Sequence, residues 1–401
     1  MNRDRKIAIL VFIILTGFVA AVFYHYVYGV SLNLGYPYDT FLFLPSDRWM
    51  DFVWPYRIAG NPYIVARPDF QNFPFLYKTA SVFVFLGPKL GLAVFLLVYS
   101  LLFFSISFME LKNDNPNENK LLTLQNSFVF TFLSYPFLIA FDRANFEIVV
   151  FFCLFFYVFF YQKHSFVSAI FLGFAIALKA FPVILAIPLL SNRRYKEIAL
   201  AAVISLSVTL ISYATLPGGI IVNIPLHIRN LQLYNQAYAV AGNSGLYFGI
   251  SAFGALKFVA ILTNLSLMSG TTYSIFSIAA LVVISVYVIL IEKKFWKKIA
   301  LLVCALNLLP MVSGDYKLLH IFIPVFLLIG ETEREPLDWL YIVLFGLLLI
   351  PKNYYLLSVL PIASISILLN PLLMFAIVIL IIVTGLTQFT HERRINFRLS
   401  P

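Results

Sequence analysis

Apolar residues form long continuous runs from one end of the sequence to the other, with short polar segments between them. A membrane-spanning helix needs about 20 mostly apolar residues, because hydrocarbon offers the backbone amides no partner outside their own helix. A β-barrel would need segments of about ten residues that alternate apolar and polar positions. The runs lie near residues 7–29, 88–110, 121–141, 147–161, 165–178, 182–191, 198–216, 274–292, 298–312, 318–330, 337–350 and 367–388. The pattern predicts an all-α integral membrane protein with about 12 transmembrane helices, in which residues 1–401 form a single transmembrane domain.

The apolar runs at 147–161 and within 165–191 are shorter than a full membrane crossing. Pro182 follows Lys179 closely, and a proline at this place predicts a break in the helix. The first run follows three basic residues and has no convincing cleavage site, so we expect an uncleaved span there and no signal peptide.

Composition supports the membrane assignment and removes other classes of protein. Of the 401 residues, 61% are hydrophobic and 11% are charged, against roughly a quarter charged in a soluble domain. The two cysteines, Cys153 and Cys304, lie deep inside apolar runs. This placement excludes a disulfide framework and a thiolate metal site.

The net charge of +10 indicates how the chain is oriented in the membrane. If the N-terminus is cytoplasmic, the cytoplasmic segments hold 17 of the 28 Lys and Arg residues, with tight clusters at 193–196 and 293–298. Basic clusters in short loops favour the cytoplasmic side. We therefore expect both termini in the cytoplasm, contact with membrane lipids, and no nucleic-acid partner.

Two long segments, 30–87 and 217–272, then face the outer side, and function is more often built in such segments. The first is the first outer loop, and the second is an outer loop with interfacial character. A general base on this side would come from a short set of carboxylates: Asp39, Asp47, Asp51, Asp69, Asp142, Glu147 and Asp315. The sequence has no P-loop, no glycine-rich nucleotide motif and no evident inverted repeat. No cofactor and no metal site is expected.

Within the first outer loop, residues 51–59 read as a short aromatic-rich interfacial helix that a Gly60-Asn61-Pro62 turn closes. Asp51 at its start has two interpretations. It could cap the helix, which is a common role for Asp at that place, or it could act in catalysis.

The loop resembles the first outer loop of glycosyltransferase family 87, whose members are polyprenyl-phosphate-sugar-dependent enzymes of the GT-C superfamily. The resemblance rests on Asp51, Phe52, Tyr56, Ala59, Gly60, Pro62 and Tyr63. Three further stretches are similar to that family in the same order. They are residues 141–147, the segment from Gly173 through Ala177 and Lys179 to Pro182, and residues 314–320, which end in His320.

The resemblance implies a GT-C-like fold and an enzyme in the cell membrane that moves a hexose or pentose from a polyprenyl-phosphate donor to a lipid or glycan acceptor, with inversion, on the outer face. Such a transfer needs a base for the acceptor hydroxyl and cations for the departing phosphate. The implied base is Asp51, with Asp47 as its main rival. The candidate phosphate-binding residues are Arg143, Lys179, Arg229, Lys317 and His320, and the candidate substrate-binding residues are Tyr56, Asp142, Asn145 and Asp315.

Each candidate cation has a plainer interpretation, which is snorkelling to the interface or an ion pair with Asp142, Glu147 or Asp315. Two other functions also stay open. A lipid-linked-saccharide flippase would have a charged central cavity and two-fold repetition, whereas the charges here cluster at the outer ends of the helices. An O-antigen polymerase would have its long outer loops later in the chain, so the early Asp-bearing loop favours the glycosyltransferase.

Overall fold

The computed structural model describes residues 1–60, 72–112, 119–234, 236–237, 246, 248–266, 268–355 and 363–399, without the side chains of residues 392–399. Pro62, Tyr63 and Asp69 lie outside the described residues. Within the described ranges the chain is helical, and the only β-type pairings are isolated bridges between Gly249 and Gly314 and between Tyr355 and Ser364.

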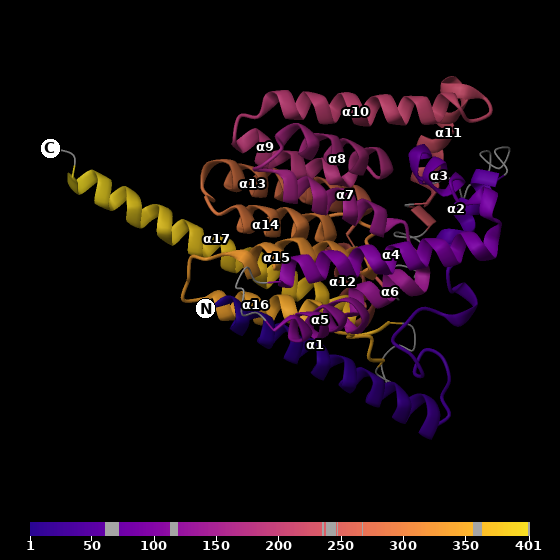
Figure 1. The fold of residues 1–401 in the computed structure, drawn as a ribbon, viewed down its shortest axis with the longest axis horizontal. Coiled ribbons are helices and arrows are strands. Elements are labelled where there is room, and N and C mark those ends of the chain that lie inside the picture. The colour runs from indigo at the N-terminus through magenta and orange to yellow at the C-terminus, as the bar shows by residue number, and fades with distance from the viewer. Residues whose placement is uncertain are drawn as a thin grey trace.

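A set of apolar helices, most of them running side by side along the long axis of Figure 1, forms the body of the protein. These helices are α1 (Arg3–His25), α4 (Pro88–Leu111), α5 (Lys120–Phe128), α6 (Tyr135–Arg143), α7 (Glu147–Phe160), α8 (Ser165–Leu178), α9 (Ile187–Ser191), α10 (Tyr195–Ala214), α12 (Ala252–Thr263), α13 (Gly270–Leu290), α14 (Phe295–Leu308), α15 (Phe322–Gly330), α16 (Asp338–Leu348) and α17 (Ser366–Leu399). Three more helices, α2 (Met50–Gly60), α3 (Pro74–Ser81) and α11 (Gly219–Tyr234), lie at the end of the body opposite to the two termini (Figure 1).

Five helices are long and apolar enough to cross a membrane: Arg3–Ser31, Pro88–Leu111, Tyr195–Ala214, Gly270–Leu290 and Ser366–His391. A sixth crossing results if Lys120–Leu133 and Tyr135–Arg143, which meet at 52°, form one bent span. These helices confirm an all-α membrane protein. Each of the 12 apolar runs contains helix, but several of the helices have only 10–17 residues. The number of about 12 crossings stays a prediction.

Two breaks in the apolar helices bring polar residues toward one end of the body. Ser134 is extended and Pro136 follows within the first turn of α6, where a proline needs no amide partner, so the chain bends there. The second break confirms the one predicted near Pro182, but it begins earlier. Helix α8 stops at Leu178, Lys179 is extended (φ −152°, ψ 141°), and the 3₁₀ helix η6 (Phe181–Ala186) follows.

A left-handed residue joins α6 to α7. Ala144 has φ 48° and ψ 46°, and the amides of Ala144 and Asn145 donate to the carbonyls of Phe141 and Ala140. This αL ending turns the chain sharply. As a result, Arg143, Asn145 and Glu147 project from a single tight corner.

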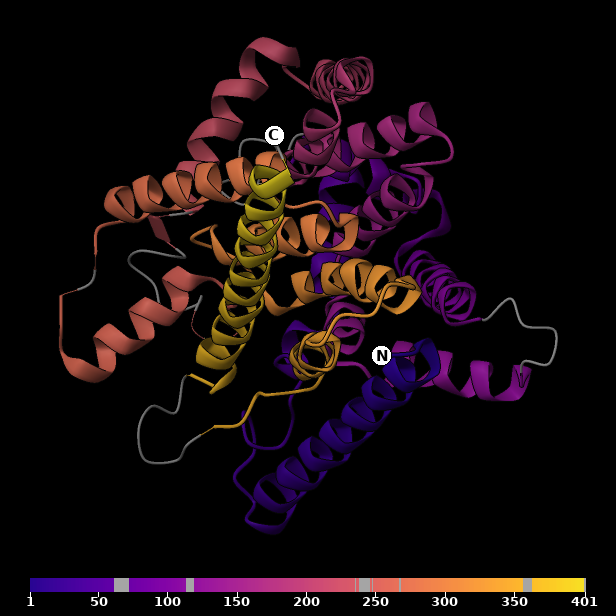
Figure 2. The ribbon, with the colours of Figure 1, turned by 90° about the vertical axis from the view of Figure 1, so that its left-hand side faces the viewer.

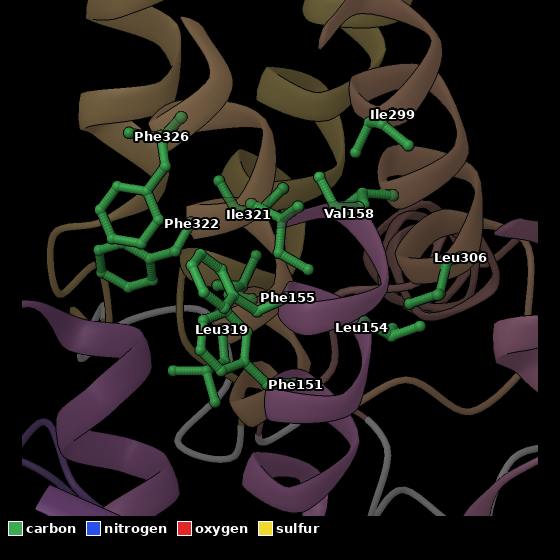
Figure 3. Close-up of a cluster of buried hydrophobic side chains, with 14 of the residues drawn as sticks. Phe151, Leu154, Phe155, Val158, Ile299, Leu306, Leu319, Ile321, Phe322 and Phe326 are labelled. Carbon is green, nitrogen blue, oxygen red and sulfur yellow. The ribbon is translucent and has the colours of Figure 1, made fainter. Parts of the chain in front are cut away.

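The packed centre of the protein lies next to this corner, around α7. Figure 3 shows Phe151, Phe155 and their neighbours on α7 facing residues of α14, of the 3₁₀ helix η9 (Asp315–Ile321) and of α15. Leu319, Ile321 and Phe322 are fully buried. Because protein interiors pack at crystal-like density, this cluster fixes η9, and with it the polar residues at the start of η9, against α7.

Both termini lie at one end of the body, which faces the viewer in Figure 2, and α2, α3 and α11 lie at the other end (Figure 1). The described helices of the two long segments thus lie at the end opposite to the termini, and the side of the membrane that each end faces stays a prediction. Reporter fusions at Asn117 and Asn243, two positions outside the described residues, should therefore report opposite sides of the membrane, with Asn117 cytoplasmic. Fusions that report the same side would contradict this topology.

Candidate active site

Asp51 lies in the first turn of α2, and its carboxylate is held by two side chains from the α6–α7 corner. Arg143 donates from Nε to Oδ2 over 3.1 Å and from Nη2 to Oδ1, and Asn145 donates from Nδ2 to Oδ2 over 2.5 Å. A carboxylate offers about four lone-pair sites. Three are used, so Oδ1 keeps one site for another donor. These contacts favour a role for Asp51 beyond capping its own helix.

Arg143 is fixed from several sides, which makes the position of Asp51 well defined. Its Nη1 donates to the carbonyl of Asp47 over 2.8 Å, and its guanidinium lies 4.2 Å from the centre of the Phe43 ring. The neighbouring Asp142 accepts from Nε of Arg48 and from the amide of Phe43. The segment before α2 is therefore tied to the end of α6.

A second network lies on the other side of Asn145 and is centred on Glu147, which is fully buried. Its carboxylate accepts from Nζ of Lys179 over 2.5 Å and from Nε2 of His320 over 2.7 Å. The backbone amide of Glu147 donates to Oδ1 of Asn145 over 2.7 Å. Asn145 thus bridges the two networks, because its amide nitrogen contacts Asp51 and its amide oxygen contacts Glu147.

The other ring nitrogen of His320, Nδ1, is buried and has no hydrogen-bond partner in the part of the chain that the structure describes. The ring is therefore oriented by its single hydrogen bond, from Nε2 to the carboxylate of Glu147.

A cavity of about 530 Å³ opens between these networks. Its polar lining includes Asp51, Asn72, Asn145, Lys179 and Lys317. Aromatic side chains form much of the remaining wall: Trp54, Phe73, Phe146, Phe181, Tyr234 and Tyr316. Of the described residues that line this cavity, Asp51 is the single carboxylate. A cavity of this size, with aromatic walls and a few convergent polar groups, is typical of a small-molecule site.

Lys317 is the cation in this cavity whose charge is not balanced. Among the described residues its ammonium makes no ion pair, and it lies 4.4 Å from the centre of the Phe181 ring. Burial lowers the pKa of Lys317 to about 8, against the raising effect of the nearby Glu147 charge. An anion bound in the cavity would favour the charged form further, because an opposite charge favours ionisation.

Asp315 lies behind the cavity rather than in its wall. It is fully buried and accepts a hydrogen bond from the hydroxyl of Tyr135, while its Oδ1 has no partner within the described part of the protein. Burial raises the pKa of Asp315 to about 6, even though the Tyr135 hydroxyl and the charge of Lys352 act in the other direction. The bridge between residues 248–250 and 313–315 holds this turn in place.

The structure brings some of the residues predicted from sequence together and leaves others apart. Asp51, Asn145, Lys179 and Lys317 line the cavity, and Arg143 and His320 support them from behind. Tyr56 does not line the cavity. It follows Asp51 by five positions on α2, so its side chain points to a different face of the helix. Its ring stacks on Phe52 and its hydroxyl donates to the carbonyl of Val84.

Three other candidates, Asp47, Asp142 and Arg229, do not line the cavity. Asp142 is paired with Arg48, and Asp47 contacts Arg143 through its backbone carbonyl. Arg229 is exposed on α11 and does not line the cavity. The phosphate-binding role of Arg229 and the substrate-binding roles of Tyr56 and Asp142 therefore find no support in this geometry.

Sequence reasoning assigned no role in the site to several residues that the structure places there. Glu147 was considered as one of the outer carboxylates and as an ion-pair partner, whereas the structure shows that it contacts Lys179, His320 and Asn145 together. Trp54 and Tyr316 were not singled out, although each lies next to a predicted residue: Trp54 is one helical turn after Asp51 and Tyr316 precedes Lys317. In the sequence, only their proximity to Asp51 and Lys317 could have indicated that Trp54 and Tyr316 belong to the site.

In the described ranges, no group of three or more His, Cys, Asp or Glu side chains lies close enough together to hold a metal ion. Cys153 and Cys304 are both free thiols, as the sequence predicted.

Comparison with known proteins supplies the family. No match was found among curated proteins or among solved structures. A sequence model of glycosyltransferase family 87 matches residues 70–314, more than half of the chain. The match includes Arg143, Asn145, Glu147 and Lys179, and it begins after Asp51 and ends before Lys317. On this match the chain belongs to glycosyltransferase family 87, a family of membrane glycosyltransferases of the GT-C type.

Proposed function

We propose that this glycosyltransferase moves a hexose or pentose from a polyprenyl-phosphate donor to a glycan or glycolipid acceptor on the outer face of the cell membrane, with inversion at the anomeric carbon. One observation carries the proposal. The only carboxylate among the described lining residues, Asp51, shares a single cavity with two lysines, Lys179 and Lys317. A base and a phosphate-binding pair are the two things that this reaction requires.

Asp51 suits the role of general base. The free lone-pair site on its Oδ1 can accept the proton of the acceptor hydroxyl as the oxygen attacks the anomeric carbon. The bond from that carbon to the phosphate oxygen breaks, and the phosphate leaves with the electron pair. Arg143 and Asn145 hold the carboxylate in place and keep its orientation.

The leaving phosphate gains charge as this bond breaks, and cations placed in advance stabilise such charge. Lys317 lies in the cavity wall without an anionic partner among the described residues, and Lys179 lies beside it with its charge shared with Glu147. The aromatic side chains of Trp54 and Tyr316 offer apolar faces for the sugar ring.

A single displacement fits this cavity better than a double displacement. A double displacement needs one group that attacks the anomeric carbon and a second group that exchanges protons, and the described lining supplies one carboxylate. Family membership also favours transfer over the two other functions, a flippase or an O-antigen polymerase.

The experiment that tests the proposal is a transfer assay on purified protein with a panel of polyprenyl-phosphate sugars. We expect release of polyprenyl phosphate from at least one donor, measured by mass spectrometry. Turnover of sugar nucleotides with no turnover of any polyprenyl-phosphate sugar would contradict the proposed donor class.

The pH dependence of kcat/KM tests the role of Lys317. Burial lowers the pKa of this lysine to about 8, so the charged form that would bind phosphate dominates below that pH and is lost above it. We expect kcat/KM for the donor to fall tenfold per pH unit above about 8, since this parameter follows ionisations of the free enzyme. A Lys317→Arg variant that stays folded should lose this fall, because arginine stays charged. An unchanged profile in that variant would assign the ionisation to another group.

A further inference from the structure

A second cavity, of about 380 Å³, lies on the other side of the α2–α3 wall. It is lined by Ile58 and Ala59 of α2, by Tyr77, Lys78 and Ser81 of α3, and by Thr215, Leu216 and Pro217, which follow α10. Ile58 lines both cavities, and the adjacent residues Leu76 and Tyr77 face the first and the second cavity, respectively. The site has no role in the chemistry proposed above.

Lys78 gives this cavity its charge. Its Nζ donates one long hydrogen bond, 3.3 Å, to the carbonyl of Thr215, and within the described ranges it makes no ion pair. An ammonium has three donors, so Lys78 can still bind an anion. The hydroxyls of Ser81 and Thr215 lie beside it and now donate to backbone carbonyls.

The rest of the lining is apolar. Ile58, Tyr77 and Leu216 form a small buried cluster that closes one side of the cavity. A ligand that fits must therefore combine an anionic group with apolar surface.

The position of the cavity indicates the source of such a ligand. Helix α10 is long and apolar enough to cross the membrane and ends at Ala214, one residue before Thr215. The cavity thus lies where a membrane-spanning helix ends, and Figure 1 shows α2, α3 and α11 together at this end of the body. Apolar side chains continue outside it, with Ile211 62% exposed, Ile221 88% exposed and Val222 56% exposed.

We propose that this second cavity binds the phosphate headgroup of an anionic membrane phospholipid. The phosphate contacts Nζ of Lys78, the glycerol region lies against the cluster of Ile58, Tyr77 and Leu216, and the acyl chains run over Ile211 and Ile221. Lysine and arginine at membrane boundaries bind lipid phosphates in this way. The occupant differs from the sugar donor, whose phosphate is assigned to the first cavity.

A bound lipid here would support the wall that carries Asp51. Asp51 and Ala59 lie eight residues apart on α2, which is roughly 12 Å at 1.5 Å per residue. The lipid would therefore brace the far end of the helix that positions the proposed base, without contact to the reacting atoms.

The test is a lipid titration of protein purified in neutral detergent, with dioleoyl phosphatidylglycerol as the probe and native mass spectrometry as the measurement. We expect Lys78→Gln to bind the lipid about tenfold more weakly than the wild type, a change that corresponds to about 1.4 kcal/mol. Ser81→Trp, which fills the cavity and keeps the charge, should weaken binding as much. The matched control is Lys89→Gln, an exposed lysine at the start of α4 that should leave binding unchanged.

Three results would overturn the proposal: equal affinity of the wild type and Lys78→Gln, an equal loss in Lys89→Gln, or full displacement of the lipid by inorganic phosphate at millimolar concentration. The last would mean an anion site with no preference for lipid. Asp51→Asn should bind the lipid like the wild type. The lipid titration involves no sugar transfer, so failure of the proposed enzymatic function would leave its result intact.

Discussion

Asp51→Asn should abolish sugar transfer while the protein stays folded and binds the lipid donor. Removal of a general base typically costs about 10²–10⁴ in rate. Asparagine keeps the shape of the side chain and an oxygen for Arg143, so the α2 segment should keep its position. The measurement is kcat with a polyprenyl-phosphate sugar, together with donor binding by the same preparation.

Asp47→Asn is the matched control for that variant. Asp47 contacts Arg143 through its backbone carbonyl, which the substitution preserves, so its turnover should stay near the wild-type rate. If Asp47→Asn is inactive and Asp51→Asn keeps near-normal turnover, the general base is Asp47, and the assignment to Asp51 is wrong.

The largest effect on stability is expected at Lys179. Glu147 is fully buried, whereas the Lys179 side chain is 18% exposed and lines the cavity. Lys179→Met therefore leaves a buried carboxylate with only His320 as a partner. Breaking a buried pair in this way costs about 3–5 kcal/mol. Glu147→Gln should cost less, because the lysine it leaves can turn toward cavity water.

The double variant Lys179→Met/Glu147→Gln distinguishes the energy of the Lys179–Glu147 ion pair from the effect of changing each side chain on its own. It removes both charges, so its free energy of unfolding should recover most of the loss seen in Lys179→Met. Denaturant titration in micelles measures the free energies of unfolding of the two single variants and of the double variant. Strictly additive losses would mean that the two side chains are not energetically coupled.

Most of the helices could be predicted from the sequence, because continuous apolar runs leave a membrane helix as the simplest solution. The run at 88–110, for example, is helix α4. The exact positions at which the helices break were harder to predict. Pro182 marked one of them, but the helix ends at Leu178, because Lys179 is extended and pairs with Glu147 on another helix. A partner 32 residues away cannot be deduced from local pattern.

The candidate site was predicted less completely than the fold. The loop motif identified Asp51, and the charges near helix ends identified Lys179 and Lys317. The role of Glu147 depends on α7, α8 and η9 meeting at one corner, and tertiary packing decides this. For the same reason the sequence did not show that Tyr56 faces Val84 or that Arg229 lies away from the cavity.

The most direct test of the central claim is the anomeric configuration of the product, measured by NMR after transfer by the wild-type protein from a donor of known configuration. If Asp51 acts as a base in a single displacement, the product has the configuration opposite to that of the donor. Retention of the donor configuration would require a covalent or other two-step route and would contradict the account.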